Sequence, residues 1–110
     1  MNDTVLPGAA DRATALFTDW IEGRYDQVVA GFDATMTAQL PVDQLTAAWN
    51  QILGLVGSYQ RMGVPLARQL GGYTVVDIPL TFAAGQMKGR VAYNAEGQVS
   101  GLFIVTPETP

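Results

Sequence analysis

The chain has 110 residues, 48% of them hydrophobic and 15% charged, and its ten acidic and six basic residues give a net charge of −4. This length and composition are those of one globular domain with its own core. Cysteine and histidine are both absent, which excludes disulfides, thiolate or imidazole metal ligands and nucleophile–histidine pairs, and the scattered basic residues argue against nucleic-acid binding.

The apolar spacing of the N-terminal half is typical of helices. It predicts a first helix over residues 9–22, a short second helix over 25–30, and one or two further helical turns over 32–40. The clearest pattern is that of residues 41–56, where Pro41 stands in the first turn of a helix with a broad apolar side.

After Gly57 the apolar residues alternate, as they do in strands. Residues 58–70 predict one strand, broken or bulged at Gly63 and Pro65. Short turns join three more predicted strands, which are Tyr73–Phe82, Met87–Ala95 and Val99–Thr106. The sequence therefore predicts a single α+β domain over residues 1–110, with N-terminal helices packed in the concave face of a curved four-stranded antiparallel sheet. For residues 106–110 we expect a frayed end or a linker.

The turns indicate which side chains share a face of the sheet. A four-residue turn after Phe82 pairs this residue with Met87, and the same parity adds Ser100, Leu102 and Ile104 to the core face. The opposite face mixes apolar and charged residues, and we predict that it forms a homodimer interface. The candidate interface residues are Tyr73, Val75, Asp77, Arg90, Val99, Phe103 and Val105. The alternative is that a helix, a terminus or the first strand covers this face.

The concave face offers two alternatives to an association surface, which are a pocket for a small apolar ligand and a catalytic site. Aromatic and methionine side chains there suit a small apolar ligand, although residues at this spacing also form ordinary core. The candidate pocket residues are Tyr25, Phe32, Met36, Trp49, Tyr59 and Tyr93. A buried carboxylate beside a tyrosine would suit a cofactor-free isomerase or hydrolase, with Asp33 or Asp77 as the acid. The register directs Asp77 away from the helices, and Asp33 suits the cap of a turn.

The spacing of the acidic residues matches no metal site, so we predict neither a metal nor a cofactor. No apolar run approaches the ~20 residues of a membrane span, and residues 1–13 lack the apolar centre of a signal peptide. We therefore expect no membrane partner. The expected location is cytoplasmic if the chain is complete as written, and exported if a signal was removed.

Several short motifs resemble the uncharacterised bacterial family called domain of unknown function 3887. They are Phe32 and Met36 ahead of Leu40-Pro41, Trp49, the turn Gly71-Gly72-Tyr73, and the closing Gly101-Leu102-Phe103. The resemblance runs from about Ala10 to Val105. It implies a cystatin-like cone of the nuclear transport factor two superfamily, in which helices fill the concave side of a curved sheet and the outer face often dimerises. Members of the family are often attached to other domains, including α/β-hydrolases, and many are exported. The family has no settled activity, so it assigns no functional residue here.

Overall fold

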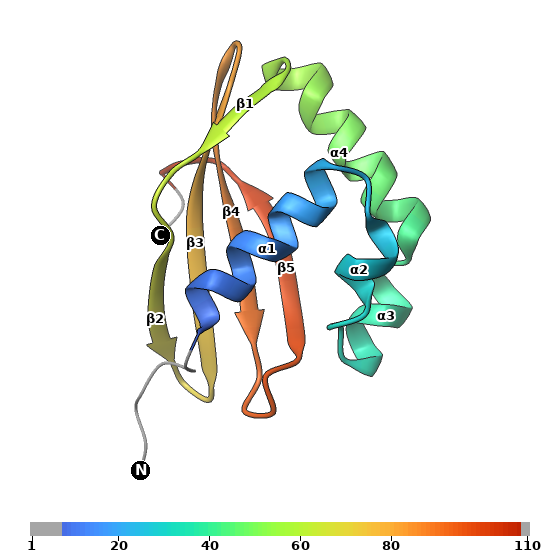
Figure 1. The fold of residues 1–110 in the computed structure, drawn as a ribbon, viewed down its shortest axis with the longest axis vertical. Helices are drawn as coiled ribbons and strands as arrows, with labels where there is room; N and C mark the ends of the chain where they lie inside the picture. Colours follow the sequence, from blue (N-terminus) through green and yellow to red (C-terminus); the bar gives the residue numbers. More distant parts are fainter. Residues whose placement is uncertain (1–7, 109–110) are drawn as a thin grey trace.

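The computed structural model describes residues 8–108 and has two layers, with helices on one face of an antiparallel sheet (Figure 1). The helices come first along the chain, and they are α1 (Ala9–Ile21), α2 (Tyr25–Val29), α3 (Ala34–Gln39) and α4 (Val42–Val56). The strands follow, and they are β1 (Tyr59–Met62), β2 (Leu66–Leu70), β3 (Tyr73–Phe82), β4 (Gly85–Tyr93) and β5 (Val99–Val105). The α+β prediction is confirmed.

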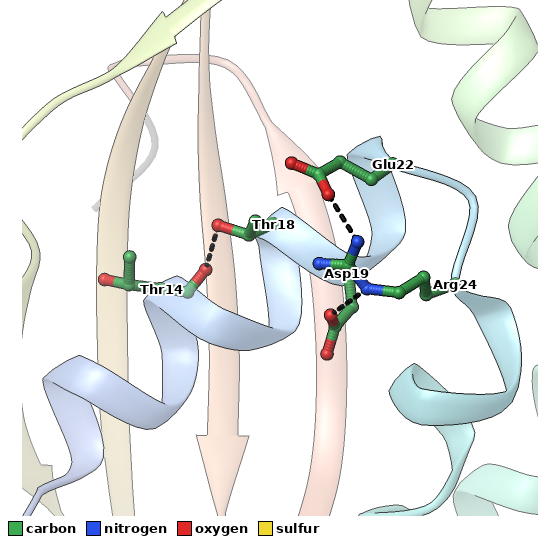
Figure 2. Close-up of polar contacts among 5 residues, drawn as sticks. All are labelled: Thr14, Thr18, Asp19, Glu22 and Arg24. Carbon is green, nitrogen blue, oxygen red and sulfur yellow. Dashed lines mark hydrogen bonds and ion pairs between the residues drawn. The ribbon is translucent and has the colours of Figure 1, made fainter.

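The first helix ends in a small polar cluster (Figure 2). Gly23 takes a positive φ of 81° just past the end of α1, and Arg24 turns back to bind the helix. Its Nε donates to Asp19 Oδ1 at 2.8 Å, and its Nη1 donates to Glu22 Oε1. Earlier in α1, the Thr18 hydroxyl donates to the carbonyl of Thr14 at 2.8 Å. These contacts keep the outer side of α1 polar and fix the turn into α2.

The N-cap residues mark where α3 and α4 begin. Asp33 is the N-cap of α3, and its carboxylate accepts the Met36 N–H at 2.8 Å, as the sequence suggested. Pro41 is the N-cap of α4 rather than a residue of its first turn. The N–H of the Trp20 indole donates to the carbonyl of Leu45 at 3.0 Å, which joins the end of α1 to the start of α4.

The sheet has five strands, one more than predicted, because the segment 58–70 forms two of them. Both β1 and β2 pair with the same side of β3, and β4 pairs with its other side. The chain leaves the sheet between β1 and β2, where the Gly63 N–H donates to the carbonyl of Pro79 at 2.7 Å. A Cβ on Gly63 would meet the Pro79 ring at 3.2 Å, so any larger residue here needs that ring to shift by a few tenths of an ångström.

The turn between β3 and β4 is shorter than predicted. It contains only Ala83 and Ala84, so Phe82 pairs with Gly85 and Met87 pairs with Leu80. The predicted pairing of Phe82 with Met87 is wrong by two residues. A shift of two residues keeps every side chain on its expected face, because side chains alternate with a period of two.

Strand β5 begins with a bulge that the sequence analysis missed. Val99 pairs with Tyr93, whereas Gly101 pairs with Ala92, so Ser100 is an extra residue. The predicted place of Val99 on the outer face is therefore wrong. Val99 is 1% exposed and belongs to the core, where it also forms a parallel bridge with Phe32.

The core lies between the sheet and the helices and is built on aromatic side chains. The rings of Phe17, Trp20 and Trp49 follow one another at 5.8 and 5.9 Å between centroids, and Trp49 continues to Tyr59 and Phe82. Buried aliphatic side chains of β3 and β4 lie below these rings. The helices and the concave face of the sheet therefore share one continuous core.

Candidate association surface

The predicted pocket residues lie in or against the core. Phe32, Met36, Trp49 and Tyr93 are buried, while Tyr25 and Tyr59 are half-buried and pack against the same cluster. Tyr93 also borders a small hollow of about 230 Å³. The structure thus gives each of these side chains a packing partner, and their binding of a ligand stays a prediction.

Two of the predicted pocket tyrosines remain neutral phenols at neutral pH. Burial raises the pKa of Tyr59. Burial also raises the pKa of Tyr93, an effect that the Arg12 guanidinium, 4.7 Å from the ring centroid, partly opposes. Neither candidate acid joins them on the concave side in the described residues, since Asp33 caps α3 and Asp77 lies on the opposite face.

The face of the sheet away from the helices is called the outer face below. Paired residues of neighbouring strands share a face, so the register defines it. Its residues are Arg61 of β1; Leu66, Arg68 and Leu70 of β2; Tyr73, Val75, Asp77, Pro79 and Thr81 of β3; Gln86, Lys88, Arg90 and Ala92 of β4; and Gly101, Phe103 and Val105 of β5. In the described part of the chain, no helix packs on it, because all four helices contribute to the core on the other side.

Four large apolar side chains of the outer face are exposed. Leu66 is 67% exposed, Leu70 58%, Tyr73 49% and Phe103 52%. They come from three strands and surround a centre of charged side chains. Exposed apolar residues of this size on one surface are typical of protein–protein contacts.

Asp77 is the centre of an ion-pair network on the outer face. Its Oδ2 accepts the Arg68 Nη1 at 2.8 Å, and its Oδ1 accepts the Arg90 Nε at 2.7 Å. A second bond from Arg90 Nη2 to Oδ2 at 3.2 Å makes this pair bidentate. The Asp77 side chain is only 9% exposed. Asp77 thus pairs across the strands with Arg90 of β4, and Arg68 of β2 is a second partner.

The network sets the charge states of its members. Burial alone would raise the pKa of Asp77, but the hydrogen bonds and positive charge of Arg90, with the charge of Arg68, outweigh burial and leave that pKa below its usual value. The hydrogen bond to Asp77 raises the pKa of Arg90. The outer face therefore carries a carboxylate whose charge is already compensated within the domain.

Two hollows flank Arg68 on the outer face. One, of about 720 Å³, lies between the hairpin of β2 and β3 and the side chain of Phe103. The other, of about 420 Å³, lies between Leu66, Pro79 and Lys88. The outer face is therefore not flat, and side chains of a partner protein could fill these two hollows.

The predicted interface residues differ in how accessible they are. Tyr73 and Phe103 are exposed, and Val105 is half-buried. Val75 is only 5% exposed, so its side chain is covered by its neighbours and is not available to a partner.

Strand β2 supplies three outer-face residues that the sequence analysis did not propose, namely Leu66, Arg68 and Leu70. The sequence does contain a feature that places these three residues on the outer face. The Gly71-Gly72 turn sets β2 against β3, so Leu70 is opposite Tyr73 and each second residue before it joins the same face.

Charge is unevenly divided between the two sides of the molecule. The helices carry six acidic residues: Asp11, Asp19, Glu22, Asp26, Asp33 as the cap of α3, and Asp43. The outer side of the sheet carries four of the six basic residues, which are Arg61, Arg68, Lys88 and Arg90, with Asp77 as its one acid within the strands. A partner of the outer face meets a basic surface with apolar surroundings.

The described residues 8–108 hold no metal cluster and no membrane-spanning helix. This range holds no group of three or more acidic side chains placed to bind a metal ion. None of its helices combines the length and the apolar character needed to cross a membrane.

Comparison with known proteins gives a family match over most of the chain. The model of a family described as "Protein of unknown function (DUF3887)" matches residues 13–102. Neither the curated proteins nor the solved structures contain a match to the chain.

Proposed function

The chain belongs to the DUF3887 family, and from its outer face we propose that it is a non-catalytic association domain that forms a homodimer through this face. The observation that carries the proposal is the set of exposed apolar side chains Leu66, Leu70, Tyr73 and Phe103 around the Asp77 network. Removing such side chains from water contributes about 25 cal/mol per Å² of apolar surface.

A second copy can be accommodated because Asp77 already pairs with two of the basic residues at the centre, although the face keeps a net positive charge whose repulsion the apolar contacts must outweigh. Arg68 and Arg90 are already bound to Asp77, so their burial in an interface leaves no isolated carboxylate. The exposed apolar residues lie on both sides of this centre. A two-fold axis near Arg68 would place the apolar side chains of each copy against those of the other.

The alternative of a small apolar-molecule binder or a cofactor-free isomerase or hydrolase has less support. Its proposed ligand residues pack in the core, and its two candidate acids are engaged elsewhere, Asp33 in capping α3 and Asp77 in ion pairs. An activity at the concave side would require a different acid.

The proposal is tested by the mass in solution, measured by light scattering after size exclusion over a hundredfold dilution. We expect a dimer that the substitution Phe103→Asp converts to a monomer with unchanged circular dichroism, because it adds a charge to an exposed apolar side chain of the face. Leu55→Asp is the matched control, since Leu55 is 70% exposed but lies on α4. A monomer at all concentrations, or equal effects of the two substitutions, would contradict the proposal.

A further inference from the structure

The sheet ends at β5, but the helical layer continues past it. Figure 1 shows α3 and α4 lying beyond β5, on the side away from β4. β5 has β4 as its strand partner, and only its first residue bridges to a helix-side segment, at Phe32. In residues 8–108, no second strand pairs with the rest of this edge of β5.

Along this edge, the backbone groups are hydrogen-bonded before the bulge at Ser100 and are without backbone partners after it, within residues 8–108. The Val99 N–H donates to the carbonyl of Gly31 at 2.7 Å, and the Val99 carbonyl accepts the Asp33 N–H at 2.9 Å. After the bulge, alternation turns the N–H and C=O groups of Leu102 and Ile104 away from β4. Within residues 8–108 these groups have no backbone partner beyond the edge. A row of such groups is a template for another strand.

An apolar groove of about 370 Å³ lies beside this edge. Its walls come from the middle and end of α4, from one residue each of α1 and the end of α3, and from the concave sides of β4 and β5. The lining residues are Trp20, Leu40, Ala48, Gln51, Ile52, Leu55, Met87, Leu102 and Ile104. None of them is charged. A side chain entering the groove must itself be uncharged and apolar.

The two edges of the sheet differ in how well they are protected against pairing with an additional strand, and β5 is the less protected edge. On the opposite side, β1 and β2 are short, Pro65 separates them, and Arg61 and Arg68 add charge, which are common devices against strand pairing. β5 is seven residues long and has no charged residue and no proline. Only the bulge at Ser100 interrupts it, and that lies at the end already bridged to Phe32.

We propose that the edge of β5 binds an extended segment of another polypeptide as an added strand, with alternate apolar side chains of that segment filling the groove below α4. The backbone groups of Leu102 and Ile104 require a polypeptide rather than a small molecule, and the groove selects apolar side chains on one face. A single segment fits better than a second copy, because a second domain would bring its own helical layer into the space that α4 already covers. The site is separate from the outer face.

The test uses the full chain and a synthetic peptide of alternating valine and threonine, with a lysine at each end for solubility. Amide hydrogen exchange is followed by NMR. We expect rapid exchange at Leu102 and Ile104 in the free protein and slow exchange with the peptide. The amides of Ala67 and Gln69, which face outward at the opposite edge, serve as internal controls and are expected not to change.

Two variants and one modified peptide separate strand addition from simple apolar binding. Ala48→Arg fills the groove and Ile104→Pro removes an outward N–H, and each is expected to weaken binding about tenfold. A peptide methylated on alternate backbone nitrogens keeps its side chains but cannot form the ladder, and it is expected not to bind. Binding should persist in Phe103→Asp, whose changed side chain lies on the outer face.

Three outcomes would overturn the proposal. The first is slow exchange at Leu102 and Ile104 in the free protein, which would mean that the chain covers its own edge. The second is the absence of added protection with the peptide. The third is equal binding of the methylated peptide, which would make the groove a site for apolar groups in general.

Discussion

At the scale of single residues, Asp77 connects the outer face to the pH dependence of stability. Its folded-state pKa lies below the usual value, so it contributes stability above pH ~4, which is lost as the pH falls through the folded-state value. We expect Asp77→Asn to lower the free energy of unfolding by about 2 kcal/mol at neutral pH. The difference from the unchanged protein should shrink as the pH falls below ~4, toward the lowered folded-state pKa at which Asp77 itself becomes neutral. Urea unfolding at several pH values measures this, and a difference independent of pH would contradict it.

Gly89 is a second residue whose size the packing dictates. It lies on β4 directly under Phe17, and a Cβ there would come within 2.7 Å of the ring carbon Cζ. Phe17 is fully buried, so its ring can yield only by shifting against the neighbouring core side chains. We therefore expect Gly89→Ala to destabilise the fold by about 1–3 kcal/mol, although alanine usually favours a strand over glycine.

A double-mutant cycle with Phe17→Leu tests this cause. If the ring causes the clash, alanine at position 89 should cost less in the Phe17→Leu background than in the unchanged protein. Equal costs in both backgrounds, measured by urea unfolding, would place the cause elsewhere.

At the scale of elements, the bulge in β5 separates two valines that the simple register places on one face. Val99 is buried against Phe32, whereas Val105 is half-buried on the outer face. In the Phe103→Asp background, we expect Val99→Thr to cost about 1–3 kcal/mol, because a hydroxyl becomes buried, and Val105→Thr to cost less than about 0.5 kcal/mol. Thermal unfolding followed by circular dichroism measures both. Similar costs would contradict the observed register.

The elements themselves were largely predictable, and the exceptions have local causes. The stripes of Leu16, Phe17 and Trp20 and of Leu45 and Trp49 predicted α1 and α4, because helical burial repeats in the sequence. The bulge at Ser100 was not predictable from alternation, since one extra residue leaves both flanking segments regular.

The candidate site was predictable only in part, for a physical reason. Alternation places Asp77 and Arg90 on one face, but their contact also depends on the length of the β3–β4 turn. The contribution of Arg68 depends on how the chain divides between β1 and β2. Tertiary pairing decides both, and no local pattern in the sequence records it.

At the scale of the whole molecule, the division of charge predicts how salt affects association. In a homodimer through the outer face, two basic surfaces approach each other, and added salt screens their repulsion. We expect the dimer to become tighter, by about tenfold, between ~0.01 M and ~0.15 M salt. Analytical ultracentrifugation at several salt concentrations measures this. Weaker association with salt would indicate that the basic face meets the acidic helical side of the next copy.

The order of the elements along the chain has a consequence for synthesis on the ribosome. The apolar sides of α1 to α4 leave the ribosome first, but the strands that cover them extend to Val105. At usual translation rates the segment between Val56 and Val105 takes roughly 3–10 s to appear. During that interval the nascent helices have no sheet to pack against. The domain therefore folds late in its own synthesis, and its helical half is the part of the nascent chain most in need of a chaperone.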